Sequence, residues 1–135
     1  MKCALYARVA CSQKTVNGMD LGIESQITRM QDYCKSKGFK DVAIFEDCAY
    51  SGNDTNRPSL KRLIASMEKD EIKMVIVTDL NRLGRNLGNM EGLLNKFYVN
   101  GVTIISLSEN LTILPHELYE NFSSVNSLMN LLHRT

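Results

Sequence analysis

Short apolar runs alternate along the chain with longer segments in which apolar residues recur every three or four positions. This alternation constrains the fold more than any other feature. The apolar runs predict buried strands at residues 3–7, 42–45, 74–77 and 102–107. The helical spacing predicts helices at residues 23–37, 58–67, 87–100 and 118–132. The order favours an α/β fold of three layers, with a mostly parallel central sheet flanked by helices.

Polar loops follow the predicted strands, at the sheet edge where open parallel sheets bind ligands. Four arginines lie in these loops, namely Arg8, Arg57, Arg82 and Arg85. Guanidinium groups match phosphate oxygens bidentately, stay charged at working pH, and can stabilise a phosphodiester displacement without a metal. If the four arginines converge, they would therefore create an anion-binding site. The alternative is that they do not converge and are ordinary solvated charges on the surface. Hydroxyl and amide groups are offered nearby by Tyr6, Ser12, Gln26 and Ser51.

Composition excludes several classes of function. A formal net charge of +1 rules out a uniformly basic nucleic-acid coat, so any DNA contact must use local clusters. The four cysteines form no CxxC pair and the two histidines are not spaced as ligands, so we expect no metal. No apolar run approaches the ~18 residues of a membrane span, and no signal peptide is evident. Free thiols and the missing export signal predict a cytoplasmic protein that does not engage membranes.

Several sequence blocks resemble the serine recombinases, the resolvase/invertase family, in that family's order and spacing. They point to the N-terminal catalytic domain of a large serine recombinase or a transposon-type member, and they extend to about residue 105. The blocks are Tyr-Ala-Arg-Val (6–9), Ile-Glu-Ser-Gln (23–26), Tyr-Ser-Gly (50–52) with Arg-Pro (57–58), and Leu-Asn-Arg-Leu-Gly-Arg-Asn (80–86).

This resemblance implies site-specific DNA recombination, with DNA as the partner and no small-molecule substrate. In the family, a serine attacks a DNA phosphate, forms a phosphoserine link and releases a 3′ hydroxyl. Four subunits then exchange the strands and religate them, so the chain is expected to act as a homodimer or tetramer on DNA. The covalent link conserves bond energy, so no cofactor is expected.

The resemblance also assigns roles to the arginines. Arg8, Arg82 and Arg85 would bind the scissile phosphate, and Arg57 would assist from a mobile loop that precedes the second helix. Around them, Gln26 and Ser51 would position reacting groups.

Two further positions carry more qualified assignments. Tyr6 would buttress the pocket, although plain packing within its strand is the alternative. Asn81 stands where many members have an acidic residue, so it can form hydrogen bonds but cannot accept a proton.

The nucleophile position departs from the family, because Ala10 stands where the serine is expected. A methyl group cannot attack phosphorus, so cleavage should be lost while phosphate binding remains. Ser12 is two residues away, and displacing a nucleophile even ~1 Å is costly. The Cys11 side chain should point elsewhere. The alanine is either natural, giving a degenerate recombinase, or introduced to trap an inactive protein.

Three other functions compete with recombination as interpretations of the sequence. The alternative is a non-catalytic module that binds DNA or a recombinase partner and keeps the phosphate-binding arginines. A receiver-like signalling domain would need clustered acids after its first strand, where Arg8 stands instead. A dinucleotide-binding domain would need a GxGxxG motif there, and none follows.

Domain organisation is expected to divide near residue 110. Residues 1–110 would form the resolvase-like catalytic core. Residues 111–135 would begin a C-terminal amphipathic helix that packs on the core or dimerises. No helix-turn-helix or zinc ribbon follows, so a DNA-reading domain is expected to be missing from this chain.

Overall fold

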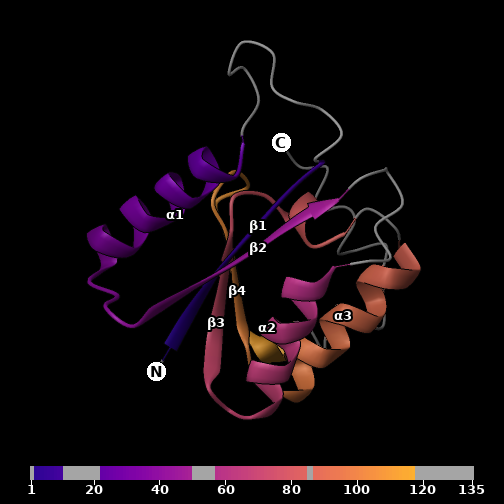
Figure 1. Ribbon diagram of the computed structural model, residues 1–135. Helices are drawn as coiled ribbons and strands as arrows, with labels where there is room; N and C mark the ends of the chain where they lie inside the picture. Colours follow the sequence, from indigo (N-terminus) through magenta and orange to yellow (C-terminus); the bar gives the residue numbers. More distant parts are fainter. Residues whose placement is uncertain (1, 11–21, 50–56, 85–86, 118–135) are drawn as a thin grey trace.

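A central five-stranded sheet organises the protein, as seen in a computed structural model that describes residues 2–10, 22–49, 57–84 and 87–117. The strands lie in the order β2-β1-β3-β4-β5, and the first four are mutually parallel (Figure 1). The fifth strand runs antiparallel to β4. The strands are β1 (Lys2–Ala10), β2 (Val42–Ala49), β3 (Ile72–Val77), β4 (Thr103–Ser106) and β5 (Leu111–Ile113).

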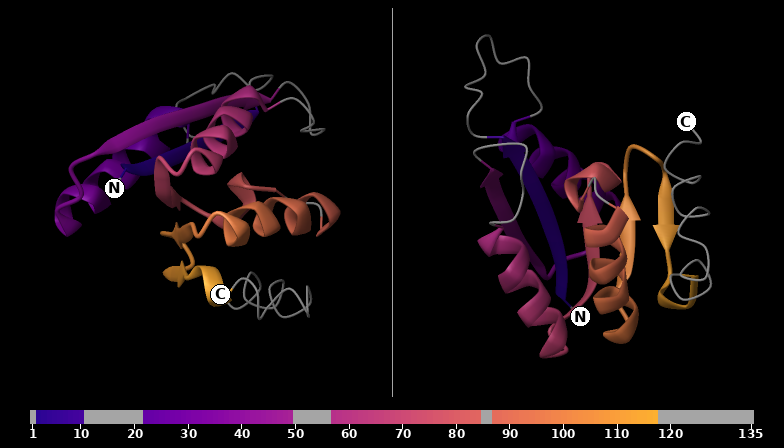
Figure 2. Two further views of the ribbon diagram at one scale, coloured as in Figure 1. Left: turned by 90° about the horizontal axis from the view of Figure 1, so that it is seen from below. Right: turned by 90° about the vertical axis from the view of Figure 1, so that its right-hand side faces the viewer.

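Helices cover both faces of the sheet, so the predicted three-layer α/β fold is confirmed. Helix α1 (Ile23–Lys37) packs on one face, while α2 (Pro58–Glu68) and α3 (Leu87–Val99) pack on the other (Figure 2). A single 3₁₀ turn, η1 (Leu80–Arg82), follows β3. Because each helix returns antiparallel to the strands, the amino ends of the helices lie at the carboxyl ends of the strands.

Strand β1 shows why the two faces form two hydrophobic cores. Side chains alternate along a strand, and β1 is buried on both faces. Its Leu5 and Ala7 join the core under α1, whereas Ala4 and Tyr6 join the core shared with α2 and α3. All of these side chains are fully buried. The apolar run that predicted this strand therefore has no polar face.

Helix boundaries follow local chemistry. Gly38 ends α1 with φ +77°, a left-handed conformation that glycine adopts at low cost, and Phe39 N–H donates to the Cys34 carbonyl at 2.9 Å. Pro58 occupies the first turn of α2, where its missing N–H is not needed.

The structure corrects the sequence predictions at the carboxyl ends of two strands. The predicted first run stopped before Arg8, yet β1 continues to Ala10, with Arg8 paired to Asp47 of β2. Strand β2 continues to Ala49, through residues expected to open a loop. Arg8 and Asp47 remain in strands because they pair with each other across β1 and β2 and because other elements form hydrogen bonds with their side chains.

Strand β5 was not predicted. It extends the sheet to Ile113, past residue 110, where we expected the core to end.

The final helix predicted at 118–132 lies outside the described residues. Within the described ranges, no helix has the length and hydropathy that a bilayer span requires. Cys3 and Cys34 are free thiols.

Candidate phosphate-binding site

The carboxyl-end edge of the sheet gathers the candidate residues from four separate elements. Tyr6 lies in the middle of β1 and Arg8 nearer its carboxyl end, and Gln26 lies in the first turn of α1. Arg57 immediately precedes α2, and Arg82 ends η1. All but Arg82 are buried. Because parallel strands end at the same edge, residues far apart in sequence meet here.

Arg8 and Arg82 bind each other's main chain. Arg8 Nε donates to the Arg82 carbonyl at 3.1 Å, and Arg8 Nη2 donates to the Asn81 carbonyl at 2.9 Å. In return, Arg82 Nη1 donates to the Arg8 carbonyl at 3.0 Å. The end of β1 and the η1 turn are thereby joined through two guanidinium groups.

Gln26 completes the hydrogen bonding of β1 where the neighbouring strand ends. The pairing of β1 with β3 runs only to Leu5 and Ile76. Beyond it, Gln26 Oε1 accepts from Arg8 N–H and Gln26 Nε2 donates to the Arg8 carbonyl, both at 3.1 Å. A buried peptide group without partners would be costly, so the glutamine amide replaces a strand neighbour.

Arg57 turns inward rather than toward solvent. Its Nη1 donates to the Leu83 carbonyl and its Nη2 to the Arg82 carbonyl, each at 2.6 Å. Its Nε and Nη2 also donate to Tyr6 Oη, at 3.2 and 3.1 Å. The guanidinium carbon lies 5.4 Å from the centre of the Tyr6 ring. Arg57, which was expected to assist from a loop, is therefore buried beside Arg8 and Arg82 in this conformation. We call these three residues the arginine cluster.

Asp47 is a member of this network that sequence reasoning missed. It accepts the Tyr6 hydroxyl at 2.8 Å, and it accepts the backbone N–H groups of Ser59 and Leu60 at 2.8 and 3.0 Å. Asp47 therefore caps α2 from the neighbouring strand. One signal was available, because Arg57, the residue that precedes α2, has no side-chain acceptor with which to cap the helix.

Two interactions set the electrostatics of the cluster. Burial raises the pKa of the Tyr6 hydroxyl, an effect that the nearby Arg57 charge partly opposes, so the tyrosine remains a proton donor toward Asp47. Arg82 Nε lies 3.2 Å from Asp79 Oδ2. That contact is an ion pair rather than a hydrogen bond, because the buried Nε–H has no acceptor in line. One-fifth of the Arg82 side chain is exposed to solvent.

The predicted site residues divide into three groups. The structure brings together Tyr6, Arg8, Gln26, Arg57 and Arg82. Asn81 contributes its carbonyl, while the residue as a whole is exposed. Arg85 and Ser51 are not among the described residues. Ala10 is placed by its backbone alone, at the end of β1. The described part of the chain holds no cluster of metal-ligating side chains.

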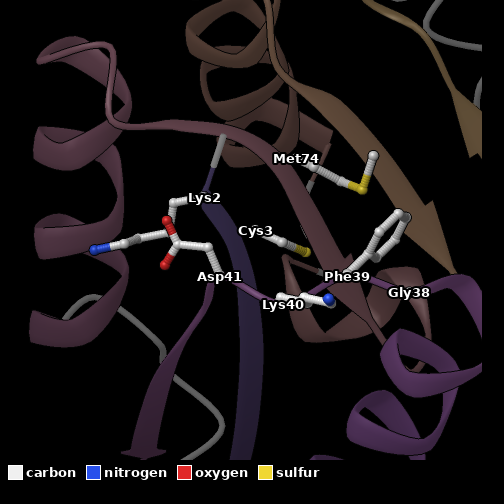
Figure 3. Close-up of a pocket in the computed structure, with 7 residues that line it drawn as sticks. All are labelled: Lys2, Cys3, Gly38, Phe39, Lys40, Asp41 and Met74. Atoms are coloured by element: carbon white, nitrogen blue, oxygen red, sulfur yellow. The ribbon is translucent and has the colours of Figure 1, made fainter.

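A cavity of about 360 Å³ lies away from this cluster, at the amino ends of the strands (Figure 3). Cys3, Phe39 and Met74 line it with apolar surface, and Lys2 and Asp41 stand beside them. None of the site residues predicted from the sequence lines this cavity. It is therefore separate from the arginine cluster.

Comparison with known proteins places this geometry in a family. The family model for the resolvase N-terminal domain matches residues 3–130. A putative DNA recombinase of Bacillus subtilis is 37% identical over 86 residues, which cover 64% of this chain and 16% of that protein. The transposon Tn3 resolvase of Escherichia coli is 31% identical over 107 residues, covering 79% of this chain and 50% of that protein. The chain thus spans half or less of these relatives.

A solved structure agrees with the sequence comparisons. The N-terminal catalytic domain of TP901-1 integrase has a TM-score of 0.76 and 28% identity, covering 98% of this chain and 99% of that one. The resemblance drawn from separate sequence blocks is confirmed. Since the family model spans nearly all of the sequence, the chain belongs to the resolvase family, through its N-terminal domain.

Proposed function

We propose that this chain is the catalytic-type domain of a site-specific DNA recombinase, and that its arginine cluster binds a DNA phosphate. One observation carries the proposal. Arg8 and Arg57 donate hydrogen bonds to the backbone of residues 81–83, and Arg82 belongs to the same turn. Three guanidinium groups around one turn create the local positive charge that a chain of net charge +1 needs to bind DNA.

Phosphate binding would replace hydrogen bonds that the arginines now make to carbonyl oxygens. A phosphate oxygen carries a full charge, so it is a stronger acceptor for a guanidinium than a neutral carbonyl. Arg82 is the group best placed to meet DNA first, because part of its side chain is exposed. We therefore expect DNA to reorganise the contacts between η1 and its arginines.

DNA cleavage requires a nucleophile in addition to the phosphate-binding arginines, and Ala10 occupies the position where the family has its serine. In the reaction implied by the family, a serine oxygen forms a bond to phosphorus while the bond to the 3′ oxygen breaks. Alanine offers no oxygen for that step. We propose that this chain, with alanine at position 10, binds DNA without forming a covalent link.

Restoring the hydroxyl tests this proposal. Full-length protein carrying Ala10→Ser is incubated with a library of nicked DNA duplexes, and covalent adducts are recovered under denaturing conditions. We expect adducts from Ala10→Ser and none from the native protein. The matched control is Ala10→Ser combined with Arg8→Ala, which keeps the hydroxyl but removes a phosphate ligand and should abolish adducts. An adduct formed by the native protein would refute the assignment of Ala10.

The second candidate is a non-catalytic module that binds DNA or a recombinase partner, and Ala10 is the observation that favours it. This function predicts the same dependence of DNA binding on the arginines but no adduct from Ala10→Ser. Assembly as a dimer or tetramer on DNA is also a proposal. Light scattering of the full-length protein with and without DNA would measure it.

A further inference from the structure

The turn between β4 and β5 packs against the start of η1. Leu107 N–H donates to the Val77 carbonyl at 3.1 Å, and Ser108 N–H donates to the Thr78 carbonyl at 2.8 Å. These bonds continue the pairing of β4 with β3 beyond the last residue of each strand. Glu109 follows in the turn, and its Oε1 accepts the Leu80 N–H at 3.2 Å. A carboxylate from a distant turn thus reaches the first residue of η1.

The η1 turn lacks a cap of its own. The first N–H groups of a helical turn have no partner within it. Asp79, which precedes the turn, makes no side-chain cap hydrogen bond. Leu80 is only 1% exposed, so water cannot easily satisfy its N–H. Glu109 fills this role, and the buried Ser106 hydroxyl donates to the same carboxylate oxygen and holds it in place.

The same turn anchors the arginine cluster. Arg82 belongs to η1, and the carbonyls that accept hydrogen bonds from Arg8 and Arg57 belong to residues 81, 82 and 83. A shift of the turn would therefore move one guanidinium directly and remove acceptors from the other two. Small displacements of binding groups have large effects when several of them must act on one phosphate.

We propose that Glu109 is a positioning residue for the arginine cluster, acting through its hydrogen bond to the first residue of η1. The inference rests on the proposed phosphate-binding function. A positioning role also predicts that removing Glu109 changes DNA affinity in the direction opposite to the one that the loss of a negative charge alone would give. Removing an acidic group near an anion site should strengthen DNA binding by Coulomb attraction, whereas loss of positioning should weaken it.

Three variants separate these effects. Glu109→Ala removes both the charge and the acceptor, while Glu109→Gln removes the charge but keeps an oxygen for the Leu80 N–H. Glu117→Ala is the matched control, because Glu117 Oε2 also accepts a backbone N–H, that of Leu114, at 3.2 Å, in the turn after β5. Binding is measured by fluorescence anisotropy with a labelled duplex of arbitrary sequence at low salt, where phosphate contacts dominate.

We expect Glu109→Ala to weaken binding about 3- to 10-fold, the range that one ordinary hydrogen bond contributes. Glu109→Gln should stay within about twofold of the native chain, and Glu117→Ala should leave binding unchanged or slightly tighter. A further variant, Ser106→Ala, removes only the hydroxyl that holds the Glu109 carboxylate. It should weaken DNA binding in the same direction as Glu109→Ala but by less. Each variant is assayed well below its own unfolding temperature.

Arg82→Ala distinguishes failure of the inference from failure of the proposed function. If Arg82→Ala does not weaken binding, the arginine cluster does not bind phosphate and the proposed function fails. If Arg82→Ala weakens binding but Glu109→Ala leaves it unchanged or tighter, the positioning role is overturned. Once Arg82 is already alanine, Glu109→Ala should have much less effect on DNA affinity while lowering thermal stability as before. Equal effects of Glu109→Ala in both backgrounds would also contradict the inference.

Discussion

The two edges of the sheet use opposite kinds of side chain. Every buried polar or charged residue in the described ranges lies at the carboxyl-end edge, on a strand end, a helix start or the segment after β3. These residues are Arg8, Gln26, Asp47, Arg57, Ser59, Thr78 and Ser106. At the amino-end edge, the cavity is lined by Cys3, Phe39 and Met74, and its charged neighbours Lys2, Lys40 and Asp41 are exposed.

The connectivity of the fold concentrates polar side chains at one edge of the sheet. Helix starts and strand ends meet there, and both present backbone groups that lack partners within their own element. Side chains such as Asp47 and Gln26 supply those partners. The groups that complete the fold and the groups proposed to bind phosphate are therefore the same network.

The comparison predicts its largest effect at Arg57. Replacing it with alanine at the carboxyl-end edge should lower the free energy of unfolding by about 2–4 kcal/mol, because the Leu83 carbonyl loses its donor and a buried side chain is removed. Lys2→Ala, at the amino-end edge, should change it by less than about 0.5 kcal/mol. Urea denaturation followed by circular dichroism measures both. Equal losses at the two positions would show that the two edges do not differ in how their charged side chains stabilise the fold.

A smaller effect is expected at Asp47. In Asp47→Asn, one carboxylate oxygen becomes an amide donor that faces other donors, from the Tyr6 hydroxyl or the start of α2. We expect a loss of about 1–3 kcal/mol. The matched control is Asp32→Asn, which makes the same chemical change on the exposed surface of α1 and should be nearly neutral. Thermal unfolding of both variants would decide, and an equal response would remove Asp47 from the network.

The smallest effect concerns pH and the amino-end edge. Burial, followed by the neighbouring Cys34, raises the pKa of the Cys3 thiol from 9.0 to about 12. Because the folded-state value is the higher one, the thiol's contribution to stability is complete below pH 9 and is lost as the pH rises toward 12. We expect a loss of about 1 kcal/mol between pH 9 and 10.

Alkaline denaturation of Cys3→Ala checks this expectation. The variant should be less stable at neutral pH because it loses buried contacts, but its stability should fall less steeply above pH 9. Tyr6 supplies a similar slope from the opposite edge, since burial raises its pKa as well. An unchanged alkaline slope in Cys3→Ala would mean that this thiol does not couple ionisation to folding.

The interior of the fold was predictable because buried strands require apolar runs. The strand ends were not, because Arg8 and Asp47 have the polarity of loop residues and remain in strands only through contacts with other elements. Strand β5, with three residues, is too short to leave a periodic pattern. The family was nevertheless predicted correctly, because the blocks that resemble the resolvase family are short and local in sequence.

The candidate site was predictable in position but not in hydrogen bonding. Strand order was enough to expect the arginines at one edge. The inward direction of Arg57 depends on the Leu83 carbonyl, 26 residues away in sequence, and the cap from Glu109 spans 29 residues. Partnerships of this range have no local signature, so Asp47 and Glu109 were missed, whereas the sequence did place Arg8, Arg57 and Arg82 at this edge.

The reciprocal bonds of Arg8 and Arg82 have a consequence for how such a domain changes over generations. Each arginine binds the other's main chain, so selection for a folded domain alone is enough to retain both. A lineage that loses its nucleophile would keep these arginines long after cleavage had ceased. Substitution at either position would remove that residue's own donor but leave its carbonyl as an acceptor, so the remaining arginine would keep its bond and the two could be lost one at a time.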